Sequence, residues 1–92
     1  MNDFLEDLGR RWQQAASTRG AEIEAPELDS KVAQELLDLA RVTAHSQERR
    51  FAPLAAYLAG VAVERLRSQR PELTGPEIAA YIAAVRAEVE AE

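Results

Sequence analysis

Leu36–Gly60, which reads LLDLARVTAHSQERRFAPLAAYLAG, is the most informative stretch of the chain. It contains the only histidine of the chain, His45, followed by the charged triplet Glu-Arg-Arg at residues 48–50. No charged residue then occurs from Phe51 to Val63. A polar segment between two apolar segments with helical spacing predicts two helices joined by a short charged loop.

The composition of the whole chain predicts helices outside this stretch as well. Its 92 residues are 47% hydrophobic and 29% charged, which is typical of a globular domain rather than a disordered one. Only 5% of the residues are aromatic, so the core must be built from Leu, Ile, Val and Ala. Abundant alanine with few β-branched runs favours helix over sheet. We therefore expect an all-α, single-domain four-helix bundle spanning residues 1–92.

Apolar periodicity places the helices at residues 3–18, 30–46, 53–68 and 75–90. The third is apolar on all sides through Val63, a pattern typical of a buried central helix. We expect Gly60 to allow close packing of this helix against a neighbour, so that Gly60→Leu would overpack the interface.

Several residues predict where the helices begin and end. Asp3 can cap the first helix, and Gly20 suits the left-handed position after its end. Pro53 is favoured in a first helical turn and is expected to open the third helix. Thr74 and Glu77 have the spacing of a capping box at the start of the fourth helix.

Three aromatic side chains fall on apolar helical positions. They are Trp12 in the first predicted helix, Tyr57 in the third and Tyr81 in the fourth. Stacking on a cofactor or a nucleotide base is one role for such rings. We expect all three in the core instead, because each lies on an apolar stripe or in the helix predicted to be buried.

Charge and cysteine content argue against several classes of function. The formal net charge of −5 makes the chain acidic and disfavours nucleic acid, whose binding depends on Lys and Arg neutralising phosphates. The absence of cysteine excludes disulfides and thiolate metal sites. One histidine without paired Glu-x-x-His motifs gives no metal site, and no cofactor is expected.

The sequence also gives no sign of membrane association or export. Acidic residues near the N-terminus do not resemble the basic start of a signal peptide. The uncharged run Phe51–Val63 is much shorter than the roughly 20 residues needed to span a membrane. We therefore expect a cytoplasmic protein.

His45 is the natural candidate for acid–base chemistry, because its unperturbed pKa lies near neutrality. Asp38 and Arg41 precede it on the same helical strip. A structural role at the helix end, bonded to the loop or to Asp38, is the main alternative. No Ser-His-Asp or paired-carboxylate spacing accompanies His45, so a non-enzymatic protein is expected.

Arg49 and Arg50 precede the third predicted helix, where free backbone N–H groups and two guanidinium groups could bind a small anion such as phosphate. With His45 and Arg41 they form the candidate ligand site. The alternative is that one arginine pairs with an acidic neighbour and the other is solvated. Four short helices can also leave the apolar third helix incompletely covered. A protein partner or self-association would then cover the exposed patch.

The central segment also carries a recognisable pattern. Its elements are LLDLAR, Ala44-His45, Arg49, Ala52-Pro53-Leu54 and Leu58-Ala59-Gly60. This pattern resembles a small bacterial domain family of no assigned function, whose members often occur beside, or fused to, molybdenum cofactor guanylyltransferases. It departs from the family at Ser46, where glycine is usual, and at Arg50, where proline is usual. The resemblance implies an accessory or docking role near molybdenum cofactor nucleotidylation, and no nucleotidyl transfer by this chain.

Overall fold

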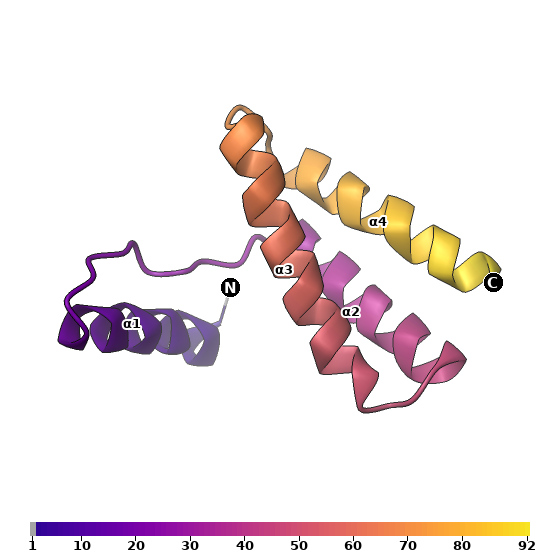
Figure 1. Cartoon of the computed structure of the whole chain (residues 1–92), viewed down its shortest axis with the longest axis horizontal. Helices are drawn as coiled ribbons and strands as arrows, with labels where there is room; N and C mark the ends of the chain where they lie inside the picture. The colour runs from indigo at the N-terminus through magenta and orange to yellow at the C-terminus, as the bar shows by residue number, and fades with distance from the viewer. Residues whose placement is uncertain (1) are drawn as a thin grey trace. The chain divides into compact units, whose positions relative to one another are not determined.

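The computed structural model describes residues 2–92, which contain four α-helices and no strand (Figure 1). The helices are α1 (Asp3–Thr18), α2 (Ser30–Ser46), α3 (Phe51–Gln69) and α4 (Gly75–Ala91). The prediction of an all-α protein with four helices is confirmed. Helices α1 and α2 span the predicted residues, whereas α3 begins two residues before Pro53. Proline is tolerated there because a first-turn residue needs no intrahelical N–H bond.

The chain divides into two compact units, Met1–Ser30 and Lys31–Glu92. The first consists of α1 and the segment after it, and the second contains nearly all of α2 together with α3 and α4. Each unit has its own internal packing, so the two are described in turn.

The first helix is capped by Asn2 rather than by the predicted Asp3. The Asn2 side chain accepts a hydrogen bond of 2.9 Å from the backbone N–H of Leu5. Asn2 has an extended backbone, with φ −141° and ψ 166°, whereas Asp3 is already helical. An N-cap residue must lie outside the helix for its side chain to reach the free N–H groups, so only Asn2 can serve.

Beyond α1 the chain turns at Gly20, whose φ of +83° is the left-handed conformation predicted for it. Residues 21–28 are not helical and lie against α1. The Gln13 side chain donates a hydrogen bond of 3.1 Å to the carbonyl of Ile23. Gly9 is buried, and a Cβ atom added to it would lie 2.4 Å from the carbonyl oxygen of Pro26. The missing side chain therefore permits this close approach.

The second unit has a hydrophobic core shared by its three helices. The buried residues at its centre are Leu39 from α2, Val63 from α3, and Ile78 and Ile82 from α4. Six partly buried side chains pack around them: Val32, Leu36, Ala55, Ala59, Leu73 and Tyr81. Tyr81 is one of these six, so the expectation that its ring packs in the core is confirmed.

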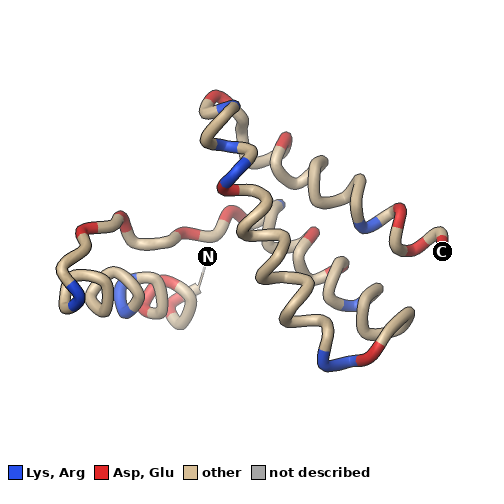
Figure 2. Tube along the Cα trace, viewed as in Figure 1, with Lys and Arg blue, Asp and Glu red and all other residues tan. Residues whose placement is uncertain are grey.

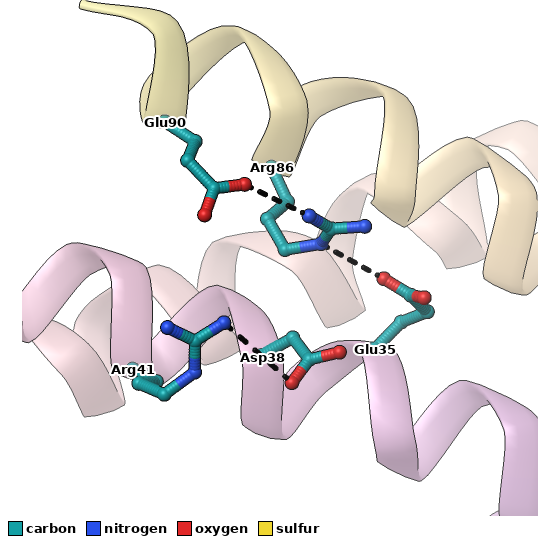
Figure 3. A network of polar contacts seen from close by, with 5 residues as sticks. All are labelled: Glu35, Asp38, Arg41, Arg86 and Glu90. Atoms are coloured by element: carbon teal, nitrogen blue, oxygen red, sulfur yellow. Dashed lines mark hydrogen bonds and ion pairs between the residues drawn. The ribbon is translucent and has the colours of Figure 1, made fainter.

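A polar network also joins α2 to α4 (Figure 3). The Arg86 guanidinium donates hydrogen bonds of 3.1 Å to Glu35 on α2 and 3.1 Å to Glu90 on its own helix. The side chains of Arg86 and Glu35 are only 22% and 21% exposed. The Glu35 hydrogen bond, opposed by desolvation, raises the pKa of Arg86, so this arginine stays charged.

Helix α4 begins with the predicted capping box. Thr74 accepts a hydrogen bond of 3.4 Å from the backbone N–H of Glu77 through its hydroxyl. In return, the Glu77 carboxylate accepts one of 2.9 Å from the backbone N–H of Thr74. Each residue satisfies a backbone N–H group that the first turn would otherwise leave free.

The prediction that α3 is a buried helix is wrong. Val63 is its only buried residue, whereas Leu54, Tyr57 and Leu58 are 58%, 71% and 66% exposed. The core of this unit lies on one side of α3, and the opposite side faces solvent. Tyr57 is exposed for the same reason, so the expectation that it lies in the core is also wrong.

Two related expectations also fail. Gly60 is exposed, and a Cβ atom added there would have no neighbouring heavy atom within 4 Å. It therefore permits no close contact within the chain, and Gly60→Leu would not overpack this structure. Trp12 is 59% exposed, so it does not lie in a core either. Nowhere in residues 2–92 is there a helix long and apolar enough to cross a membrane.

Candidate functional site

The four polar residues predicted to form a ligand site lie at one end of the helical hairpin made by α2 and α3. Arg41 and His45 belong to α2, and Arg49 and Arg50 precede α3. All four are exposed. Over residues 2–92, no hydrogen bond or ion pair joins any of the four to another. Their proximity in the sequence therefore produces no preformed pocket.

Acidic neighbours engage two of these arginines. Arg41 forms an ion pair of 4.0 Å with Asp38, visible in Figure 3. Arg50 forms one of 2.5 Å with Glu48, and its guanidinium lies 5.6 Å from the centre of the Phe51 ring. Both ion pairs are solvent-exposed and contribute little to stability. Among the described residues, the Arg49 side chain has no ion pair or hydrogen-bond partner.

The first turn of α3 offers fewer free N–H groups than the sequence implied. The N–H of Phe51 donates 2.9 Å to the carbonyl of Glu48, and that of Ala52 donates 3.1 Å to the carbonyl of Arg49. Pro53 has no N–H group at all. An anion at this helix end would therefore rely mainly on the arginine side chains.

No group of three His, Cys, Asp or Glu residues within the described chain is arranged to hold a metal ion. The polar end of the hairpin thus offers separate exposed charges rather than a convergent site.

The most distinctive surface lies instead on the solvent side of α3. We call Leu54, Tyr57, Leu58 and Val61 the α3 stripe, because positions i, i+3, i+4 and i+7 share one face of a helix. Three of the four are more than half exposed, and Val61 is half-buried. The sequence predicts that the third helix can be incompletely covered, but it does not identify these four residues, because the opposite face of α3 is equally apolar. Glu64 is a signal in the sequence that this face meets solvent, because it is charged and lies two turns after Tyr57 on the same face.

An apolar groove adjoins the α3 stripe. It has a volume of about 290 Å³ and lies between α3 and α4, with α2 contributing Leu39 and Thr43. Leu58 belongs to both the stripe and the groove lining. On the α4 side, Val85 lines the groove and is 48% exposed. Stripe and groove therefore form one continuous apolar surface.

Charges mark the two ends of this surface and are absent between them. Figure 2 shows α3 uncharged along its middle, with charged residues at both ends. Residues 48–50 lie at its start, and Glu64, Arg65 and Arg67 lie in its second half. This is the pattern of an apolar patch rimmed by polar groups.

The first unit has a separate cleft of about 650 Å³ between α1 and residues 25–28. Trp12, Glu6 and Arg10 are among its lining residues. The 70% exposure of Phe4 shows that α1 also carries uncovered apolar surface.

Comparison with known proteins identifies a family. A family model described as a domain of unknown function (DUF6457) matches residues 5–92. No curated protein and no solved structure matches the chain. The match covers residues of both compact units.

Proposed function

This chain belongs to the DUF6457 family, a domain of unknown function, and we propose that it is a non-enzymatic helical interaction module. The observation that carries the proposal is the exposed α3 stripe, with Leu58 66% and Tyr57 71% exposed. Uncovered apolar surface in contact with water is unfavourable, and contiguous patches rimmed by charges mark protein interaction sites.

The groove beside the stripe fits the same role. Shallow apolar grooves between helices bind the apolar face of an amphipathic helix. Leu58 and Val85 stand on opposite sides of this groove, where both would contact such a helix. A helix seated there would cover apolar surface from α3 and α4 together.

We further propose that one partner is a molybdenum cofactor guanylyltransferase in the cytoplasm. The support is the resemblance of residues 36–60 to a domain family found beside or fused to these enzymes. In this role the chain would be an accessory protein, and the enzyme would carry out nucleotidyl transfer.

Calorimetric titration of the full chain into a guanylyltransferase from the same organism tests this proposal. We expect saturable binding that Leu58→Glu weakens by about tenfold or more, because a charge would be buried at the contact. Leu37→Glu is the matched control, since Leu37 on α2 is also 66% exposed, and it should bind as the wild type does. Absence of binding would exclude the guanylyltransferase as a partner. If Leu58→Glu bound as tightly as the wild type, the α3 stripe would be excluded as the binding site.

Anion binding at His45, Arg41, Arg49 and Arg50 is the second candidate function. The observation in its favour is that Arg49 has no ion pair or hydrogen-bond partner among the described residues. Titration with millimolar phosphate, followed through the backbone amide resonances of residues 52–57, tests it. Saturable shifts that Arg49→Ala abolishes would support the site, and unchanged resonances would rule it out.

A further inference from the structure

The cleft of the first unit has one wall from α1 and one from the segment after it. Its lining includes Leu5, Leu8 and Trp12 on α1, and Pro26, Glu27 and Leu28 on the segment. The buried Gly9 lies against the backbone carbonyl of Pro26, so the two walls meet directly. The volume of about 650 Å³ falls within the range of about 300–1,000 Å³ that is typical of ligand sites.

Most of the negative charge of the chain lies in this unit. Residues 1–30 carry seven Asp or Glu and three Arg, a formal charge of −4, whereas residues 31–92 carry −1. Four of the acidic residues lie in residues 21–29, which contain no basic residue, and Figure 2 shows them in red along the segment that follows α1. The charge therefore favours a cationic occupant of the cleft.

The arginines of this unit do not neutralise that charge. Arg10, which lines the cleft, and Arg11 form ion pairs of 3.8 Å and 2.7 Å with Asp7. Arg19 donates a hydrogen bond of 2.9 Å to a backbone carbonyl of α1. The side chain of Glu27 forms no ion pair or hydrogen bond with any residue that the structure describes. Its carboxylate is therefore available to a cation from another molecule.

Trp12 supplies a second group that a cation can bind. It is 59% exposed, and no cation within residues 2–92 lies over its ring. A guanidinium is planar, so it can stack on an indole and donate paired hydrogen bonds to a carboxylate, which an ammonium cannot do. We propose that the cleft binds an arginine-bearing segment of a partner protein, with the guanidinium held by Trp12 and Glu27.

The leucines of the cleft define the rest of this partner segment. Leu5, Leu8 and Leu28 would contact the aliphatic stem of the arginine and an apolar side chain beside it. This site goes beyond the proposed role of the α3 stripe, because all of its residues lie in the first unit.

Fluorescence titration of the full chain tests the proposal, because Trp12 is the only tryptophan and reports directly on the cleft. The probe is an acetylated, amidated hexapeptide, Gly-Leu-Arg-Leu-Arg-Gly, added to millimolar concentration at about 0.15 M salt, where distant charges are screened. We expect a saturable change in emission. The same peptide with citrulline in place of arginine keeps the shape without the charge, and should bind about tenfold more weakly.

Variants of the chain locate the contact. Glu27→Gln should weaken binding about threefold, as expected for an exposed ion pair. Glu24→Gln is the matched control, because it removes the same charge from an exposed residue of the same segment that does not line the cleft, and it should bind as the wild type does. Gly9→Ala should also weaken binding, since a Cβ atom there would force the walls apart. Trp12→Leu, followed by calorimetry, should do the same.

Three results would overturn the proposal. The first is an emission that does not change, and the second is equal binding of the citrulline peptide. The third is equal weakening by Glu24→Gln and Glu27→Gln, which would show attraction to an acidic segment without a cleft. None of these results bears on the guanylyltransferase, whose binding is tested through Leu58 in the second unit.

Discussion

Two helical glycines have opposite surroundings, although each lies in the interior of a helix. A Cβ atom on Gly9 would lie 2.4 Å from a backbone oxygen of Pro26. A Cβ atom on Gly60 would meet nothing within 4 Å. The first glycine is therefore required by contacts within the chain, whereas the second is not. Substitution to alanine should have opposite effects at the two positions.

Gly60→Ala should stabilise the monomer by about 1 kcal/mol, the difference between the two residues in helix propensity. Urea unfolding at low micromolar concentration measures the effect. A decrease in the free energy of unfolding would contradict the exposed position of Gly60.

Gly9→Ala should detach residues 21–28 from α1, because a backbone carbonyl cannot yield as a flexible side chain can. The hydrogen bond between Gln13 and the Ile23 carbonyl should then break. Hydrogen exchange would show faster exchange over residues 21–28 with α1 still helical. Gly60→Ala is the control and should leave this exchange unchanged. Unaltered protection in Gly9→Ala would mean that Pro26 does not approach Gly9 so closely.

At the scale of single elements, the capping box of α4 couples helix stability to pH. Hydrogen bonds from the Thr74 backbone and hydroxyl hold the pKa of Glu77 below its ordinary value. A carboxylate with a lowered pKa stabilises the fold fully above its ordinary pKa. That stabilisation is lost as the pH falls through the lowered value.

Thermal unfolding between about pH 6 and about pH 3 tests this coupling, because the ordinary pKa of glutamate is about 4.3. The melting temperature of the wild type should fall more steeply with acidification than that of Glu77→Gln, which retains an acceptor oxygen but cannot titrate. Parallel curves for the two proteins would show that Glu77 does not contribute.

The helices differ in how well the sequence predicts them. For α1, α2 and α4, apolar periodicity and residues such as Gly20 and Thr74 act locally, so the boundaries follow from short segments. The burial of α3 depends instead on how many neighbours cover it. A helix that is apolar on all sides gives the same pattern whether it is enclosed or carries an exposed stripe such as Leu54–Val61.

At the scale of the whole molecule, the only hydrophobic core described is the one shared by α2, α3 and α4. Ile82 is its most deeply buried member, at 3% exposure. Ile82→Ala should therefore cost about 2–5 kcal/mol of unfolding free energy. Val85→Ala, one turn later and 48% exposed, should cost much less. Equal losses measured by urea unfolding would place both side chains in the core.

The candidate site was only partly predictable from sequence. The positions of Arg49 and His45 around the hairpin followed from the charged segment between two helices. The pairing of Arg50 with Glu48 and the bonded N–H groups of α3 depend on loop geometry that residue types do not encode. The possibility of an exposed patch on the third helix was foreseen, but its residues were not. The residues of the patch can be identified only once the packing of α2, α3 and α4 is known.

We propose that the α3 stripe serves binding rather than folding. The most direct test is the free energy of urea unfolding of Leu58→Gln, measured beside the wild type at low micromolar concentration. Because Leu58 is 66% exposed, the two values should agree within about 0.5 kcal/mol. A loss of about 2 kcal/mol or more would show that Leu58 belongs to the core and would contradict the claim.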